Sequence, residues 1–409
     1  MNVLFITLAD IRSIEEHGIY TDLLREFANN NHKVYIVSPI ERRNKQSTGI
    51  VNIKQNEYSD NVTILKVKTG NIQKTNMIEK GVSTLLLEYQ LIQAISHYYK
   101  DVTFDLILYS TPPVTIVKPI RYVKQRDHAK TYLLLKDITP QAIVDLGVMT
   151  TTGIKGFIYK YFRSKEKQLY KISDYIGCMS QANVDYVIQH NSELDPKKVE
   201  ICPNCIEVID KSVDENTKMT IRKKYGIPLD KRVFVYGGNL GKPQGISFLI
   251  KCLHKCKDIE NAFFLIVGDG TEYGKIESYV NKYRQSNLKL MKHLPKEEYD
   301  TLVGACDVGL VFLDHRFTTP NFPSRLLSYM QAKLPILAAT DSSTDIREVL
   351  LDGNFGWWCE STDTKVFNMM VNQALKSNTR ELGKNGFAYL LNNYTANIGF
   401  EIITKRLIK

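Results

Sequence analysis

The sequence predicts an α/β protein built from two doubly wound parallel sheets, and three observations support this. Short runs rich in valine, isoleucine and leucine alternate with longer runs whose apolar residues have helical spacing. The short runs are apolar at nearly every position, as strands buried on both faces of a parallel sheet are. The alternation starts again past the middle of the 409 residues, a length that favours two domains.

The first series of elements occupies the first half of the chain. Its predicted strands are residues 3–8, 33–38, 62–67, 106–109 and 131–135. Its predicted helices are residues 18–30, 84–98 and 114–124. Strand, helix and parallel strand in succession form the βαβ units of a doubly wound sheet.

The second series follows a link near residues 203–215. Its predicted strands are residues 233–237, 263–267, 288–291, 308–312 and 336–338. Helices are predicted over 247–256, after residue 270 and from residue 323, and an amphipathic helix over 397–407 ends the chain. We predict domains at 1–205 and 206–390, with 391–409 forming a helix that packs back on the first domain.

Composition excludes several classes of protein. Hydrophobic content of 43% and charged content of 24% are typical of a soluble globular chain, and no apolar run reaches the roughly 18 residues that span a bilayer. The first residues lack a basic segment and a cleavage site, so they predict a strand rather than a signal peptide. Seven scattered cysteines favour a reduced, cytoplasmic protein, and the lone pair Cys202 and Cys205 does not favour a metal site.

The net charge of +10 is concentrated in one segment. Residues 118–171 carry twelve lysines and arginines against four acidic residues. Such a segment attracts phosphates, either of a nucleic acid or of an anionic membrane.

Within it, residues 155–171 interleave aromatic and basic side chains. A helix of this kind can lie in a membrane interface, and this is the reading we favour. Stacking on single-stranded nucleic acid and a solvated helix with core-packed aromatics are the alternatives. The membrane or acceptor candidates are Lys155, Phe157, Tyr159, Lys160, Phe162 and Arg163.

Two segments of the second half are candidate phosphate sites. Pro323 and Ser324 predict a helix start, with Ser324 as its cap and Arg325 in the first turn, where backbone N–H groups and a guanidinium can bind an anion. An ordinary capped helix is the alternative. The turn from Tyr236 to Gly245 holds four glycines and Lys242, but it is neither a dinucleotide fingerprint nor a P-loop.

Three further strand ends carry polar residues. Asp137 follows the strand 131–135, where α/β sheets bind ligands, and the alternative is that it caps the helix after Pro140. Asp269 lies between two glycines and suits a structural turn. His17 precedes the first helix and suits a surface position.

In order and spacing, these segments resemble the GT-B glycosyltransferases, and within them the retaining family GT4. The segment Asp137–Gln141 is similar to the family's "DxxPE" loop, and Gly238–Gly245 to "GNLGxxQG". The segment Ala305–Leu310 is similar to "AADVGL", and Pro323–Met330 to "PSKLxEYM". The resemblance is to capsule and O-antigen transferases, including those proposed to add N-acetyl-L-fucosamine to lipid-linked glycans.

The resemblance implies two Rossmann-like domains that face each other across a cleft. The C-terminal domain would hold a UDP-sugar, and the N-terminal domain would bind a polyprenyl-diphosphate-linked acceptor at the inner face of the cell membrane. Retention at the anomeric carbon is implied, with no metal and no other cofactor. Partners would be the anionic membrane surface and other polysaccharide-assembly enzymes, not nucleic acid.

The resemblance also assigns residues. Lys242 and Arg325 would stabilise the leaving diphosphate, and Asp137 would orient the acceptor. Donor-binding positions are Gly18, Gly238, Asn239, Gly241, Ser324, Ser328, His293 and Leu294. The family's paired glutamates are absent, since Pro320 and Ser328 occupy their positions, and one hydroxyl replaces a carboxylate. A degenerate transferase that docks on membranes or partner enzymes is therefore the alternative hypothesis.

Overall fold

The computed structural model divides the chain into two compact units. Unit 1 comprises Met1–Glu207 and Ala396–Lys409, and unit 2 comprises Val208–Thr395. The structure describes residues 1–44, 46–51, 58, 60–72 and 77–407. Among them, no helix is both long enough and apolar enough to cross a membrane.

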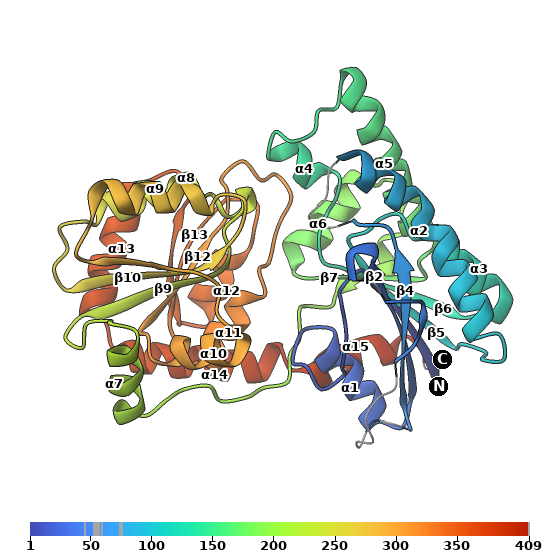
Figure 1. Cartoon of the computed structure of the whole chain (residues 1–409), viewed down its shortest axis with the longest axis horizontal. Coiled ribbons are helices and arrows are strands. Elements are labelled where there is room, and N and C mark those ends of the chain that lie inside the picture. Colours follow the sequence, from blue (N-terminus) through green and yellow to red (C-terminus); the bar gives the residue numbers. More distant parts are fainter. Residues whose placement is uncertain (45, 52–57, 59, 73–76, 408–409) are drawn as a thin grey trace. The chain divides into compact units, whose positions relative to one another are not determined.

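Unit 1 contains an eight-stranded sheet of order β3-β4-β2-β1-β5-β6-β7-β8 (Figure 1). All neighbours pair in parallel except β3 and β4. The strands are β1 (Asn2–Ile6), β2 (Lys33–Glu41), β3 (Gly49–Ile50), β4 (Val62–Thr69), β5 (Leu106–Thr111), β6 (Lys130–Leu135), β7 (Tyr175–Cys178) and β8 (Val199–Ile201).

The helices of unit 1 cover its sheet and bury two apolar cores. They are α1 (Thr21–Asn29), α2 (Met77–Tyr98), α3 (Val117–Asp127), α4 (Gln141–Asp145), α5 (Gly153–Ile172), α6 (Gln181–His190) and the C-terminal α15 (Ala396–Lys405), with the short 3-10 helices η1 (Arg42–Asn44) and η2 (Pro196–Lys198). Phe400 of α15 packs edge to face on Phe27 of α1, with ring centres 4.9 Å apart. The end of the chain thus completes unit 1.

Unit 2 contains a six-stranded, fully parallel sheet of order β11-β10-β9-β12-β13-β14. The strands are β9 (Arg232–Asn239), β10 (Ala262–Asp269), β11 (Leu288–Met291), β12 (Val308–Phe312), β13 (Ile336–Thr340) and β14 (Gly356–Glu360). The helices are α7 (Glu215–Lys224), η3 (Lys242–Gln244), α8 (Ile246–Lys255), α9 (Tyr273–Tyr283), α10 (Lys296–Gly304), α11 (Arg325–Gln331), α12 (Ile346–Asp352), α13 (Thr364–Lys376) and α14 (Thr379–Asn393).

The predicted α/β class with two doubly wound parallel sheets is confirmed. Both sheets change direction of strand order at their first strand, β1 in unit 1 and β9 in unit 2. Ligands of open α/β sheets bind at the carboxyl ends of the strands beside such a switch point. We therefore expect ligand-binding residues in the segments that follow β1, β5 and β6 in unit 1 and β9, β10 and β12 in unit 2.

Candidate functional site

The carboxyl ends of the strands of unit 2 hold the glycine-rich turn in a fixed shape. Gly238 has φ +112 and Gly245 has φ +56, in the left-handed region that glycine tolerates best. The backbone N–H of Asp314, after β12, donates to the carbonyl of Pro243 at 2.9 Å. The turn is thereby tied across the switch point between β9 and β12.

Side chains inside the turn stabilise it further. Nδ2 of Asn239 and the backbone N–H of Gly241 both donate to Oε1 of Gln244, at 3.1 and 3.2 Å. The Tyr236 hydroxyl donates to the Asn239 carbonyl at 2.8 Å. Lys242 is exposed at the start of η3 and has no ion pair with any described residue. The loop thus holds itself together, and its one lysine is left for a ligand.

Arg325 extends from the start of α11 to this turn. Its guanidinium carbon lies 4.4 Å from the centre of the Tyr236 ring. Its Nη2 lies 3.4 Å from the place that a Cβ on Gly238 would take, so the guanidinium lies directly against the backbone of this glycine. Its Nη1 is buried and has no hydrogen-bond partner in the part of the chain that the structure describes. The two segments that were predicted to bind phosphate are therefore in contact at Arg325 and Gly238.

Three tyrosines surround this guanidinium. Tyr236, Tyr299 and Tyr329 all interact with it electrostatically. Burial raises the pKa of all three phenols, that of Tyr329 to about 12, so they are neutral at pH 7. A guanidinium with a buried, unsatisfied N–H among neutral phenols is destabilising until an anion binds it. The arrangement fits a phosphate group.

The predicted helix start is confirmed, since Ser324 is the N-cap residue of α11 and Arg325 lies in its first turn, but the predicted side-chain cap is wrong. Ser324 has helical φ and ψ of −60° and −19°, and its side chain makes no capping hydrogen bond. The helix α11 has only seven residues, so its backbone contributes less to an anion site than the prediction assumed. Ser328, one turn further on, is half-buried. The case for an anion site therefore rests on the Arg325 side chain.

The other predicted donor residues of unit 2 lie apart from this cluster. His293 and Leu294 follow β11, which is two strands away from β9 in the sheet. His293 is exposed, and no described contact links it to Arg325. His293 and Leu294 thus lie at the carboxyl ends of the strands, like Arg325, but beside the end strand of the sheet.

In unit 1, Asp137 lies two residues after the end of β6. Burial raises its pKa to about 6. The N-cap position of α4 is Pro140, and no side chain caps this helix, so the capping alternative for Asp137 is wrong. Burial raises the pKa of the Tyr20 phenol to about 12, and the nearby Asp137 carboxylate also raises it. Asp137 is thus a carboxyl group with a shifted pKa at a strand end, as binding and catalytic groups often are.

The loop that holds Gly18 is organised around an arginine. Nη2 of Arg25 contacts Nδ1 of His17 at 2.9 Å, Oδ1 of Asp22 at 2.5 Å and Oε2 of Glu207 at 2.8 Å. His17, Asp22 and Glu207 each offer an atom that could bind a metal, and these atoms lie within 4.8 Å of one another. The Arg25 guanidinium contacts all three, so it occupies the position that a metal would take. Oδ1 of Asp22 also accepts a hydrogen bond from the Gly18 N–H. Arg25 and Asp22 together therefore hold the conformation of this loop.

Only part of the predicted surface of α5 faces outward. Lys155, Phe157 and Lys160 are exposed, and Phe157 is 75% exposed. The other three turn inward: Phe162 is half-buried, Tyr159 donates to Oε1 of Gln141 at 3.3 Å, and Arg163 bonds to Glu166 and Asn191. For Tyr159, Phe162 and Arg163 the prediction of a free surface is wrong, because these residues lie on the face of α5 that packs on the domain.

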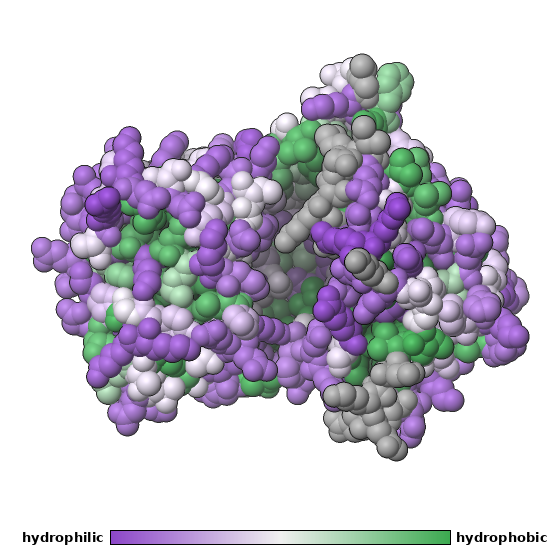
Figure 2. Space-filling model, viewed as in Figure 1, coloured by the Kyte–Doolittle hydropathy of each residue, from purple (hydrophilic) through white to green (hydrophobic). Residues whose placement is uncertain are grey.

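A second apolar stripe, which sequence reasoning missed, lies on α2. It comprises Val82, Leu85, Leu86 and Tyr89, all at least half exposed. An ion pair of 2.9 Å between Glu88 of α2 and Lys165 of α5 joins the two helices. Figure 2 shows hydrophobic side chains at the surface of this part of unit 1. Spacing of i, i+3, i+4 and i+7 was the available signal, but it equally predicts a buried face.

Comparison with known proteins agrees with the fold. Residues 217–388, which lie in unit 2, match the family model of glycosyl transferases group 1. The chain is 23% identical over 393 residues to the "Probable glycosyltransferase WbjE" of Pseudomonas aeruginosa, covering 90% of this chain and 96% of the relative.

Two solved structures have the same fold along the whole chain. Sucrose-phosphate synthase from Thermosynechococcus elongatus superposes with a TM-score of 0.74 at 14% identity, covering 99% of this chain and 98% of that one. Anabaena HepE in complex with UDP superposes with a TM-score of 0.69 at 13% identity, covering 100% and 99%. The chain thus has the GT-B fold, and the comparisons together support a glycosyltransferase.

Proposed function

We propose that this chain is a retaining glycosyltransferase of the GT4 type that transfers a sugar from a UDP-sugar to a saccharide on polyprenyl diphosphate. The observation that carries the proposal is the buried Nη1 of Arg325, which has no hydrogen-bond partner among the described residues and lies beside the glycine-rich turn. HepE, which has this fold, binds UDP. The proposed context is capsular or surface polysaccharide assembly, with N-acetyl-L-fucosamine as the sugar that the sequence resemblance suggests.

In this proposal the two cations of the site act on the leaving diphosphate. As the bond between the sugar and UDP breaks, negative charge develops on the β-phosphate. Arg325 is fixed by its tyrosines before the reaction, so it stabilises that charge without reorganising, and the exposed Lys242 adds a second positive charge. These two side chains supply the positive charge that a divalent ion supplies in other transferases.

Asp137 is the residue that we assign to the acceptor. With a pKa of about 6 it is mostly a carboxylate at pH 7, and it can accept a hydrogen bond from an acceptor hydroxyl. In a front-side reaction with retention, the departing phosphate takes the proton of that hydroxyl. Asp137 then orients the acceptor and needs no proton-transfer role.

The anionic inner face of the cell membrane is the proposed location. The apolar stripe of α2 and the exposed Phe157, Ile158 and Tyr161 of α5 would enter the lipid headgroup layer. Lys155 and Lys160 on α5 would contact lipid phosphates. A surface of this kind would bring the lipid-linked acceptor to unit 1.

Donor binding has a direct test that separates the enzyme from the docking protein. UDP should raise the melting temperature, and the shift should persist in EDTA, because Arg325 and Lys242 replace a metal. A screen of UDP-sugars with lipid-linked acceptor should then release UDP with at least one donor. Stabilisation by UDP, without release of UDP from any donor, would favour the docking protein. The absence of a carboxylate at Ser328 is the reason for keeping that alternative. No stabilisation at millimolar UDP would contradict the donor site itself.

Membrane binding is tested on vesicles. The wild-type chain should sediment with vesicles that contain anionic phosphatidylglycerol and stay in solution with neutral ones, and salt should weaken binding. Leu85→Glu and Phe157→Glu should each reduce the bound fraction several-fold. Leu391→Glu, an exposed leucine on α14 of unit 2, is the matched control and should bind like wild type. Equal loss in all three variants would contradict this surface.

A further inference from the structure

The edge strand β14 of unit 2 has one side free for pairing. The Phe355 carbonyl accepts from the Ile336 N–H at 3.0 Å, and the Ser361 N–H donates to the Thr340 carbonyl at 2.7 Å. Odd-numbered residues of this segment therefore bond to β13. Successive residues of a strand point their backbone groups to opposite sides, so Gly356 and Trp358 direct N–H and C=O away from the sheet. No described strand pairs with that side.

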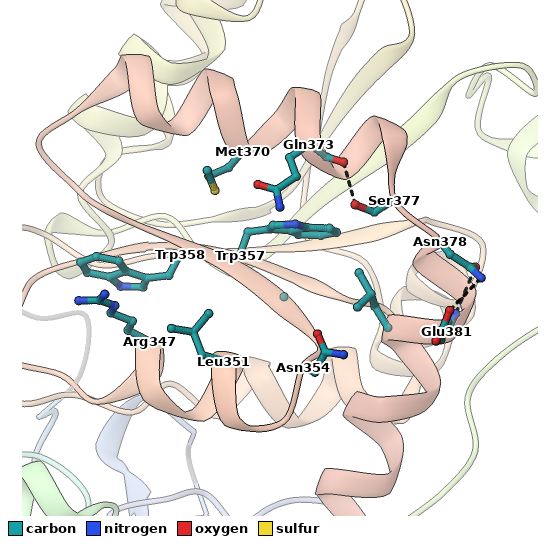
Figure 3. A pocket seen from close by; sticks show the side chains of 12 residues that line it. Arg347, Leu351, Asn354, Trp357, Trp358, Met370, Gln373, Ser377, Asn378 and Glu381 are labelled. Carbon is teal, nitrogen blue, oxygen red and sulfur yellow. Dashed lines mark hydrogen bonds between the residues drawn. The ribbon is translucent and has the colours of Figure 1, made fainter.

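This free side lies in a groove of about 790 Å³ between α12 and α13 (Figure 3). Trp357 and Trp358 of the strand line it, together with Leu351 of α12 and Met370 of α13. Leu351 is 57% exposed. An apolar groove that contains unpaired strand backbone is the kind of surface that proteins normally cover.

The two ends of the groove carry opposite charges. At the carboxyl end of β14, the Arg347 guanidinium lies 5.2 Å from the centre of the Trp358 ring. At the amino end, Glu381 lies at the start of α14, with its carboxylate bonded to Asn378. Figure 3 shows these two charged groups at opposite ends of the groove. Neither forms an ion pair with a described residue.

We propose that β14 pairs with β14 of a second copy of this chain, antiparallel about a two-fold axis at Trp357. Gly356 of each copy then lies opposite Trp358 of the other. Both residues have their backbone groups on the free side, so each pair exchanges two hydrogen bonds. The two six-stranded sheets become one continuous sheet.

The charges favour a second copy over an unrelated peptide. A two-fold axis that makes the strands antiparallel brings the Arg347 end of each groove to the Glu381 end of the other. The two opposite charges thus meet twice, as a self-complementary interface requires. Leu351 and Met370 of each copy, which line the groove, would be covered at the same time. The carboxyl ends of the strands, where Arg325 lies, take no part in this pairing.

Charge reversal on the full-length chain tests the proposal. Wild type should be a dimer by sedimentation velocity at micromolar concentration. Arg347→Glu and Glu381→Arg should each raise the dissociation constant at least about tenfold, because each places like charges together at two positions. Mixing the two variants should produce heterodimers, because both contacts of the mixed dimer then join opposite charges. The double variant should dimerise like wild type.

Two neighbours supply matched controls. Glu348→Arg on α12 and Arg380→Glu on α14 make the same charge changes beside the groove and should leave the dissociation constant unchanged. Circular dichroism and melting temperature check that each variant is folded. A monomeric wild type would overturn the proposal, and so would a dimer that both reversals leave intact. Single variants that fail to pair when mixed would overturn the proposed axis.

Discussion

Replacement of Arg325 with alanine is expected to lower kcat/KM for the UDP-sugar about 100- to 1,000-fold, which corresponds to about 2.7–4 kcal/mol of transition-state stabilisation. The physical reason is the loss of a positive charge that the protein positions in advance. Arg325 is held over the Tyr236 ring and beside Gly238, while no described acidic residue neutralises it. The measurement is steady-state UDP release, together with UDP affinity by calorimetry.

The same variant should be as stable as wild type, or more stable, when no nucleotide is present. The substitution removes Nη1 of Arg325, a buried donor that lacks a partner among the described residues. Functional sites with such groups are often less stable than they could be. UDP should then raise the melting temperature of the variant less than that of wild type. Arg325→Lys, which keeps the charge but not the fork, should recover part of the activity.

Arg380→Ala is the control for a lost surface arginine. Arg380 is exposed and pairs with Glu215 on the surface of unit 2, so activity and UDP stabilisation should stay as in wild type. Full activity in Arg325→Ala would remove this residue from the mechanism. A large fall in melting temperature without nucleotide would show instead that Arg325 has a structural role.

The central strands of both sheets were predictable because burial on both faces requires apolar residues throughout. Every residue of β12 and β13 is buried, and four of the five residues of β1 are. The strands that the sequence analysis missed lie at or near the sheet edges: β3, β7, β8 and β14. An edge strand such as β14 has alternating exposure, and its apolar run is only three residues long, between Gly356 and Glu360.

The candidate site was predictable where a motif lies within one segment. Arg325 and the turn from Gly238 to Gly245 were found in this way. Tyr299 was not, because its contact with Gly237 joins residues far apart in the chain, and periodicity carries no information on such contacts. The orientation of α5 was only partly predictable for a similar reason. Which aromatic residues face outward depends on the neighbouring helix α2, through the ion pair of Lys165 with Glu88.

Replacement of Asp137 with asparagine is expected to raise stability at neutral pH while it lowers activity. Burial raises the pKa of Asp137 from 3.8 to about 6, so the folded chain holds its proton more tightly than the unfolded chain does. Between about pH 4 and pH 6 the folded state binds more protons, and the free energy of unfolding falls as pH rises. Above that window the whole destabilisation by the buried carboxylate remains.

The asparagine variant has no carboxyl group at this position, so this contribution to the pH dependence of its free energy of unfolding is absent. Its free energy of unfolding should exceed that of wild type by about 1–3 kcal/mol at pH 7, since each pKa unit corresponds to about 1.4 kcal/mol. The difference should shrink as pH falls through 6 and disappear below about pH 4. Urea titrations at a series of pH values measure it, with Asp101→Asn, an exposed aspartate of unit 1, as the control that shows no such dependence.

Activity should change in the opposite direction from stability. An amide accepts a hydrogen bond more weakly than a carboxylate, so kcat/KM for the acceptor should fall about 10- to 100-fold. Donor hydrolysis in the absence of acceptor should stay close to wild type, because Arg325 still stabilises the diphosphate. A variant that loses stability at pH 7, or whose advantage does not depend on pH, would show that the Asp137 carboxylate is stabilised by neighbours and is not a destabilising group kept for the acceptor.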